Sequence, residues 1–193
     1  MNIEIIAIDD GFFPTQYKGR KGKTLLLGIK TINIYHIVDL AYTSILVDGL
    51  ETTNKTCRLI KLLGEANIVF LDGITYAGFD VVDADQVYLE TGIPVIVYQQ
   101  YPLDLDRVRK ALQKHFPDWK QRYNVIEKIY RKMSYYPTRW RPILFYNVGV
   151  NREDAIYYLE KTMIYSPIPE PLRLADQIAS TISRLCIINN KLL

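Results

Sequence analysis

Cysteine is scarce in this chain, which has only two cysteines among its 193 residues. Cys57 falls in a helical pattern and Cys186 lies near the C-terminus, and their spacing matches no metal-binding motif. A disulfide-rich secreted scaffold is therefore excluded, and a zinc site is not expected. The default expectation is a reduced protein of the cytoplasm.

A strong charge imbalance and long apolar runs are also absent. The net charge is only +3, which does not by itself identify a nucleic-acid-binding protein. No apolar run reaches the roughly 20 residues of a membrane-spanning helix, and the N-terminus has acidic residues where a signal peptide has basic ones. No membrane partner is expected. A hydrophobic fraction of 49% suffices for a folded core, and residues 1–193 are expected to form one domain.

Strand and helix patterns alternate along the chain. Residues 3–49 predict three strands joined by short loops, which favours antiparallel pairing. A helix at 51–63 leads into a strand at 67–71, a helix at 83–89 and a strand at 93–98, an order that predicts parallel strands. The later elements are helices at 104–115, 119–133, 152–162 and 169–186 and a strand at 143–148. The expected fold class is α/β, with three N-terminal antiparallel strands, then parallel strands, in a mixed sheet flanked by helices.

Carboxylates stand at the ends of two expected strands. Asp9 and Asp10 end the first strand, and Asp72, followed by Gly73, ends the strand at 67–71. A buried strand-end carboxylate is costly to desolvate alone, so a cation, a proton or a ligand is expected nearby. Phosphodiester hydrolysis through two metal ions needs several carboxylates from different elements, and such oxygen ligands suit Mg²⁺ or Mn²⁺. Asp9, Glu51 and Asp72 are the predicted metal ligands.

Other acidic residues compete for these roles. Asp10, Asp48, Asp80 and Asp83 are reserve candidates. Asp48 and Glu51 have the alternative of serving a turn and a helix N-terminus, where negative charge is favoured. That alternative is weaker for Asp72, because a turn needs no aspartate at the mouth of so apolar a strand.

Two basic segments are candidates for nucleic-acid contact. The loop after the first strand combines four cations with glycines, which suits a phosphate backbone, although a solvated hairpin tip is the alternative. Residues 130–141 interleave basic and aromatic side chains that can stack on unpaired bases, or that simply cover the core. The predicted nucleic-acid-binding residues are Lys18, Arg20, Lys21, Lys23, Tyr42, Arg131, Arg139, Arg141 and Arg173.

Four segments, taken in order, resemble a known family. They are AIDDGFF (7–13), ILVDGLETTNKT (45–56), FLDGITYAGFDVVDADQVYLETGIPVIVY (70–98) and PEPLRLADQIA (169–179). Together they resemble the archaeal endonuclease dU family, which is related to endonuclease V. The terminal PEPLRLAD is similar to the PEP-T-R-x-A-(D/H) signature of endonuclease V, and LDG is similar to its VDG segment.

The resemblance implies a ribonuclease H-like fold. It also implies Mg²⁺- or Mn²⁺-dependent cleavage of DNA or RNA near a deaminated base, deoxyuridine or inosine, as in DNA repair. By position, Asp9 and Asp72 resemble the first-strand and central metal ligands, and Glu51 resembles the metal-binding glutamate. Asp176 matches an acidic or histidine position of the terminal helix, where it would be an outer ligand or a proton acceptor. The expected catalytic residues are therefore Asp9, Glu51, Asp72 and Asp176.

One segment departs from endonuclease V. That family carries a proline-flanked tyrosine, PYIP, shortly before its glutamate, whereas this chain has Ala41-Tyr42-Thr43-Ser44. Tyr42 retains a ring that can stack on a base, but without the prolines the loop is expected to be less rigid. A pocket for a deaminated base is expected to differ accordingly.

Two other classes of protein stay open. One is a non-catalytic nucleic-acid-binding or regulatory module on the same fold, which would show no metal-dependent change in stability or nuclease activity. The other is an interaction protein that uses some of its 15 tyrosines for oligomer contacts. The sequence leaves the oligomeric state, the base recognised and the position of the cut open.

Overall fold

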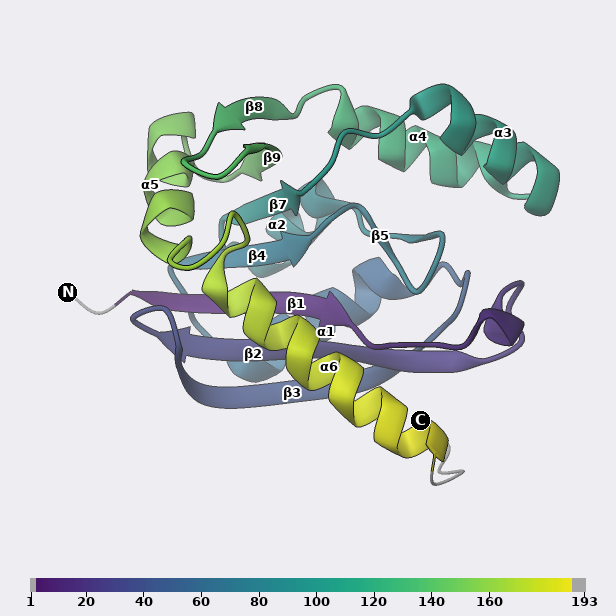
Figure 1. Ribbon diagram of the computed structural model, residues 1–193, viewed down its shortest axis with the longest axis horizontal. Coiled ribbons are helices and arrows are strands. Elements are labelled where there is room, and N and C mark those ends of the chain that lie inside the picture. Colours follow the sequence, from purple (N-terminus) through teal and green to yellow (C-terminus); the bar gives the residue numbers. More distant parts are fainter. Residues whose placement is uncertain (1–2, 189–193) are drawn as a thin grey trace.

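The computed structural model describes residues 3–188, and a seven-stranded sheet lies at its centre (Figure 1). The strand order is β3-β2-β1-β4-β7-β9-β8. β1 pairs antiparallel with β2 and parallel with β4, β4 pairs parallel with β7, and the pairs β2–β3, β7–β9 and β9–β8 are antiparallel. The strands are β1 (Glu4–Asp10), β2 (Lys23–Ile32), β3 (His36–Leu46), β4 (Ile68–Asp72), β7 (Val95–Gln99), β8 (Ser134–Pro137) and β9 (Pro142–Val148).

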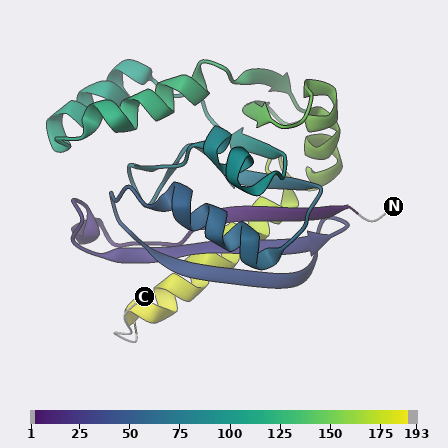
Figure 2. The same ribbon diagram turned by 180° about the vertical axis from the view of Figure 1, so that it is seen from behind.

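Helices cover both faces of this sheet. α1 (Thr52–Leu63) and α2 (Ala84–Thr91) lie on one face (Figure 2). The long α6 (Glu170–Ile188) crosses the other face over β1 and β2, with α5 (Arg152–Thr162) beside it (Figure 1). The remaining elements are α3 (Leu105–His115), α4 (Trp119–Tyr130), a 3-10 turn (Thr15–Tyr17) and the hairpin of β5 (Thr75–Tyr76) and β6 (Asp80–Val81).

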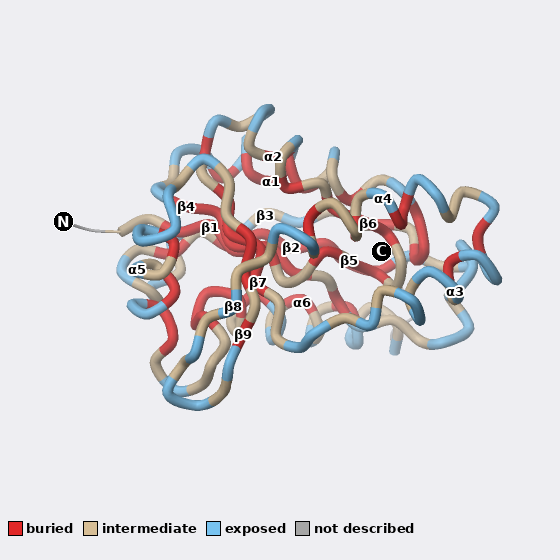
Figure 3. Tube along the Cα trace, turned by 90° about the horizontal axis from the view of Figure 1, so that it is seen from above, coloured by how far each residue is buried: buried red, intermediate tan, exposed pale blue. Residues whose placement is uncertain are grey.

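Strand alternation divides the core into two layers. Ile6 and Ile8 of β1 pack in the layer of α1 and α2, whereas Ile5 and Ala7 pack in the layer of α5 and α6. Both faces of the central strands are buried, so these strands form continuous apolar runs (Figure 3). Polar side chains that could bind a ligand are therefore expected at the ends of these strands.

Polar caps fix where several helices begin. Asp83 Oδ1 accepts hydrogen bonds from the backbone amides of Asp85 and Gln86 at the start of α2. Asp104 and Asn151 cap α3 and α5 in the same way. Among the helices of residues 3–188, none is both long and apolar enough to cross a membrane.

The α/β class and the mixed sheet flanked by helices are confirmed. The expectation of parallel strands after the first three was wrong beyond β7, because β9 returns antiparallel and brings β8 with it. No strand was expected at residues 134–137, but they form β8 and pair with β9. The helix expected at 119–133 ends at Tyr130.

Candidate active site

Asp9 and Asp72 project from one face of the sheet at neighbouring strand ends. Asp9 shares its face with Ile5, and Asp72 shares its face with Phe70, because side chains alternate along a strand. Ile5 and Phe70 both pack in the layer under α6. Since β1 and β4 are parallel neighbours in register, the two aspartates stand side by side at the carboxyl edge.

α6 brings Asp176 to the same place. The helix passes so close to the end of β1 that a Cβ atom on Gly11 would lie 2.9 Å from the carbonyl oxygen of Ala179. Asp176, one turn before Ala179, is exposed and accepts a 3.1 Å hydrogen bond from Ser180 Oγ. Its charge contributes to raising the pKa values of Asp9 and Asp72. The structure therefore places three of the four predicted catalytic residues at the same edge of the sheet.

Asp10 joins this cluster from the other side of the strand. Its Oδ2 accepts a 2.9 Å hydrogen bond from the backbone amide of Ala77, and Asp9 Oδ1 accepts one of 2.8 Å from the amide of Asp10. We call Asp9, Asp10, Asp72 and Asp176 the acidic cluster. Asp10 was only a reserve candidate in the sequence, and alternation along β1 places it on the opposite face from Asp9.

Burial and mutual repulsion weaken the acidity of the cluster. Burial raises the pKa of Asp72 to about 6, and the charge of Asp176 adds to this shift. Burial, then the charge of Asp72, raises the pKa of Asp10 to about 7 against the lowering effect of the Ala77 amide. The pKa of Asp9, which is only 7% exposed, is raised well above its usual value by burial and by Asp72. Such a set binds protons tightly, and a cation would relieve the same repulsion.

Loops beside the acidic cluster have unusual backbone geometry. Gly73 has φ +81°, a left-handed value suited to glycine, and its amide donates a 2.7 Å hydrogen bond to Tyr98 O. Asp48 and Ala77 also have positive φ angles, 59° and 43°, and the Asp48 amide donates to Ala77 O at 2.8 Å. These non-glycine residues are held by contacts from neighbouring elements.

A buried arginine binds the backbone of these two loops. Arg122 of α4 is 0% exposed, and its guanidinium donates hydrogen bonds to the carbonyl oxygens of Asp48, Gly49 and Phe79 at 2.6 to 3.0 Å. The same group forms an ion pair with Asp118 at 2.9 Å. Sequence reasoning missed Arg122, because its partners are backbone carbonyls far away in the chain.

The remaining reserve candidates have structural partners. Asp48 accepts hydrogen bonds from the amides of Gly19 and Phe79, at 2.7 and 2.9 Å. Asp80 accepts from the amides of Glu51 and Thr52 at the start of α1. Asp83 caps α2 and pairs with Lys128 at 2.8 Å. We call Arg122, Asp48, Asp80 and Asp118 the paired network.

Glu51 is the predicted catalytic residue that the structure does not bring to the others. It precedes α1, which packs against the opposite face from α6. Its Oε1 accepts a 2.7 Å hydrogen bond from the Leu46 amide and lies 2.8 Å from Lys55 Nζ. Although partial burial opposes it, the pKa of Glu51 is lowered by Lys55 and by the Leu46 amide.

The basic loop after β1 lines a cavity. Lys18 and Lys21 stand at a cavity of about 530 Å³ whose wall includes Phe79 and Phe116. Arg20 turns away and pairs with Asp118 at 2.7 Å. Lys23 begins β2 and is exposed. In this loop, Lys18 and Lys21 therefore line the cavity, whereas Arg20 forms an ion pair within the protein.

The other predicted nucleic-acid-binding residues are spread over the molecule. Arg131 directly follows α4 and pairs with Glu127 at 2.7 Å. Arg139 donates to the carbonyl oxygen of Ile164, and Arg173 pairs with Glu170 at 2.6 Å. Tyr42 is 63% exposed on β3, an edge strand of the sheet. Arg141 stacks on the ring of Tyr101, with its guanidinium carbon 4.2 Å from the ring centroid.

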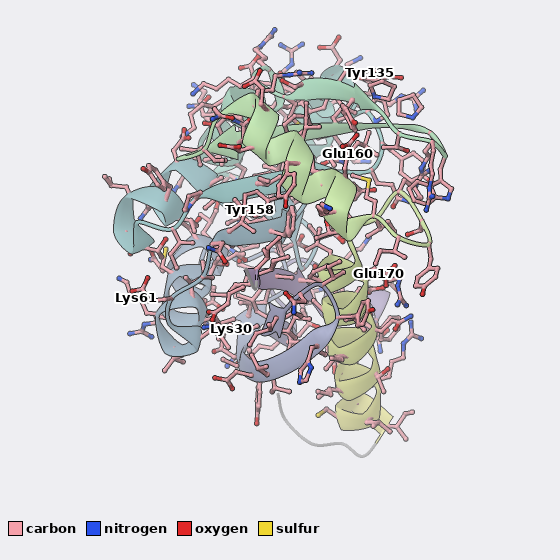
Figure 4. All side chains as sticks on the ribbon, turned by 90° about the vertical axis from the view of Figure 1, so that its left-hand side faces the viewer. Lys30, Lys61, Tyr135, Tyr158, Glu160 and Glu170 are labelled. Atoms are coloured by element: carbon pink, nitrogen blue, oxygen red, sulfur yellow. The ribbon has the colours of Figure 1, made fainter. Side chains whose placement is uncertain are left out.

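The opposite edge of the sheet carries ordinary surface pairs. Lys30 pairs with Glu4 at 2.7 Å, and Lys61 of α1 lies 3.7 Å from Glu90 of α2. Lys30 and Lys61 are labelled in Figure 4. Each of these two carboxylates has a lysine near it, whereas the acidic cluster forms no ion pair within the described residues 3–188.

The donor chemistry of the acidic cluster fits Mg²⁺ or Mn²⁺. All four side chains offer carboxylate oxygens, which are the ligands that these hard cations prefer. Within residues 3–188, no three carboxylate, imidazole or thiol groups are already drawn together at metal-binding distances. The case for a cation at the acidic cluster therefore depends on the negative charge of these carboxylates, on the burial of three of them and on their placement at one edge of the sheet.

Comparison with solved structures gives the class of this fold. A crystal structure of human ENDOV matches with a TM-score of 0.62 at 16% identity, over 96% of this chain and 86% of that one. A structure of *Ciona intestinalis* endonuclease V, in complex with a DNA containing an inosine, matches with a TM-score of 0.55 at 12% identity, over 98% and 87%. The chain thus has an α/β fold similar to that of endonuclease V.

Sequence comparison gives the family. The family model for endonuclease dU matches residues 1–183, so the chain belongs to the endonuclease dU family. A UPF0215 protein of *Thermococcus gammatolerans* is 35% identical over 93% of this chain and 92% of its own length. A crystal structure of a protein of unknown function from *Archaeoglobus fulgidus* matches with a TM-score of 0.77 and 27% identity, over 93% of this chain and 98% of that one.

Proposed function

We propose that this protein is a metal-dependent endonuclease that hydrolyses a phosphodiester bond near a deaminated base, deoxyuridine or inosine, in DNA repair. The carrying observation is the acidic cluster, whose buried carboxylates raise one another's pKa values and form no ion pair with any of residues 3–188. Membership of the endonuclease dU family supports this proposal. We also propose that the mixed sheet is ribonuclease H-like, which is consistent with it.

Asp9 and Asp72 would hold the cation, Mg²⁺ or Mn²⁺, with Asp176 as an outer ligand or proton acceptor. Bound there, the cation would activate a water molecule and offset the charge that develops on the phosphate. The chain holds Asp9 in a buried position and Asp176 in an exposed one, where its carboxylate can exchange protons with solvent. Glu51 stays a predicted ligand, which would have to leave Lys55 to reach the cluster.

Nucleic acid is the proposed partner, and the cationic loop and the aromatic cavity support it. Lys18 and Lys21 offer charge for phosphate groups, and the Phe79 and Phe116 rings offer apolar surface. Exposed Tyr42 adds an aromatic ring at the edge of the sheet. Inosine-containing DNA is the ligand of the *Ciona* endonuclease V structure, which supports testing both deaminated bases.

The test is cleavage of matched single- and double-stranded oligonucleotides that contain deoxyuridine, deoxyinosine or ribo-inosine. Each is incubated with Mg²⁺, Mn²⁺ or a chelator, using the wild-type protein, Asp72→Asn and the matched control Asp39→Asn. Asp39 lies exposed on β3. We expect metal-dependent cuts near one modified base, lost in Asp72→Asn and kept in Asp39→Asn. Binding without any cleavage would instead support a non-catalytic nucleic-acid-binding module.

A further inference from the structure

Tyr98 extends the row of functional side chains across the sheet. The parallel register of β4 and β7 places Tyr98 opposite Asp72. Both residues project into the layer under α6, because Ile96 and Tyr98 share that face of β7. Asp9, Asp72 and Tyr98 therefore follow one another on three adjacent strands at the carboxyl edge.

Within residues 3–188, the hydroxyl of Tyr98 has no hydrogen-bond partner. The residue is 1% exposed, and among residues 3–188 its hydroxyl belongs to the few buried side-chain oxygens without a hydrogen bond. Buried tyrosine hydroxyls usually find a partner, so this one requires an explanation. Burial raises the pKa of the Tyr98 hydroxyl, the charge of Asp72 raises it further, and the charge of Arg141 lowers it.

Arg141 presents a second unused donor at the same end of β7, because it directly precedes β9, the strand that pairs with β7. The guanidinium stacks on Tyr101, while its Nε is buried and has no hydrogen-bond partner within the described part of the chain. The backbone of Arg141 is fixed, since its amide donates to Thr138 Oγ1 at 3.2 Å and its carbonyl accepts from that hydroxyl at 2.6 Å. Gln99 Nε2 donates to Tyr101 O at 3.0 Å and so fixes the loop that carries the stacking ring.

We propose that the Tyr98 hydroxyl and the Arg141 guanidinium form a binding site for one phosphate group of a nucleic-acid strand, next to the acidic cluster. Both groups are donors, so the ligand must offer acceptors, and a guanidinium pairs best with an anion that has several oxygens. A phosphodiester meets both requirements. This inference rests on the proposed function and gives it a specific contact on the β7 side of Asp72.

The test measures binding in the presence of a chelator, where no cleavage occurs. Fluorescence anisotropy with a short single-stranded DNA is recorded at several salt concentrations for wild type, Tyr98→Phe, Arg141→Met and Arg141→Lys. We expect Arg141→Met to weaken binding about tenfold and to reduce the slope of log K against log salt by about one phosphate contact. Arg141→Lys should restore the slope but not the full affinity, because lysine lacks the planar fork.

Arg152→Met serves as the matched control. Arg152 also lies over an aromatic ring, with its guanidinium carbon 6.0 Å from the centroid of Phe145, but it begins α5. Its replacement should leave affinity and salt slope unchanged. Tyr98→Phe should weaken binding several-fold without changing the slope and without lowering the melting temperature. A lowered melting temperature would show that the hydroxyl already has an internal partner, and would overturn the proposal.

A strand with one uncharged methylphosphonate linkage, moved position by position, locates the contact. In wild type one linkage should cause the largest loss of binding, and in Arg141→Met that linkage should no longer matter. Equal profiles in the two proteins would overturn the proposal. If neither the wild type nor any variant binds a strand, the proposed function itself fails. Binding with the same linkage profile in wild type and Arg141→Met overturns only the phosphate site.

Discussion

Two groups of buried charge lie at the same end of the sheet and differ in how their charges are balanced. In the paired network, Arg122 meets Asp118 and three backbone carbonyls, and Asp48 and Asp80 accept from backbone amides. In the acidic cluster, Asp9, Asp10 and Asp72 have raised pKa values and repel one another. A buried charge that meets an opposite charge holds loops in place, whereas neighbouring buried carboxylates that form no ion pair among residues 3–188 favour the binding of a cation.

The largest effect is expected when the cluster loses a carboxylate. Asp72→Asn keeps the shape of the side chain but removes a charge that holds the proposed cation. We expect kcat to fall by roughly 10³-fold or more, which corresponds to about 4 kcal/mol of transition-state stabilisation. Steady-state cleavage kinetics measure this change, and a near wild-type kcat would place the catalytic metal elsewhere.

Breaking the paired network should instead damage stability. Arg122→Met removes the guanidinium donor from the carbonyl oxygens of Gly49 and Phe79 and leaves that of Asp48 only a 3.3 Å hydrogen bond from Arg20 Nε. Asp118 loses its buried cation and keeps only its ion pair with Arg20. We expect the free energy of unfolding to fall by about 3–5 kcal/mol. Urea denaturation measures it, with Arg152→Met as the control. A loss no larger than that of the control would contradict the structural role of Arg122.

The metal-free protein should lose stability as the pH rises. The folded-state pKa values of Asp72 and Asp10, about 6 and about 7, lie above the usual aspartate value of 3.8. Their stabilising contribution is therefore present below about pH 4 and is lost as the pH rises through 6 and 7. We expect Asp72 alone to contribute roughly 2–3 kcal/mol to this fall.

The measurement is urea denaturation with a chelator between pH 4.5 and 8. Asp72→Asn should flatten the decline, since it removes one of the groups that bind a proton more tightly in the folded state. A wild-type stability that rises across this range would show that the carboxylates are neutralised within the protein.

The smallest effect is expected for Glu51→Gln. Because its carboxylate already interacts with Lys55 and with the Leu46 amide, we expect kcat/KM to fall less than about tenfold, or about 1.4 kcal/mol. Cleavage kinetics beside Asp72→Asn give the comparison. An equally large loss would show that Glu51 turns from Lys55 to become the metal ligand that the sequence predicts.

Much of the sheet could be predicted from the sequence because local patterns carry it. The apolar runs of β1, β4 and β7 and the helices between them are visible in the residues themselves, and so are the aspartates at two strand ends. The antiparallel return of β9 could not be predicted, since strand direction depends on the path of the intervening α3 and α4. β8 is short and half-polar, so it resembles a loop.

In the candidate site too, local sequence patterns predicted some residues, whereas others depend on contacts between distant parts of the chain. Asp9, Asp72 and Asp176 were predicted because each stands at an element end or in a recognisable motif. Tyr98 was missed, although it closes the run IPVIVY, because only the register of β4 and β7 sets it opposite Asp72. Arg122 was missed because nothing in α4 itself shows that its partners are carbonyl groups of two distant loops.

The most direct test of the account is calorimetric titration of the chelator-free protein with Mn²⁺ at pH 7.5. Wild type should bind the ion, Asp72→Asn should bind it at least about a hundredfold more weakly, and Asp80→Asn, in the paired network, should bind it normally. This result would show that the unbalanced carboxylates are the cation site. No binding to wild type, or equal binding to wild type and Asp72→Asn, would contradict the account.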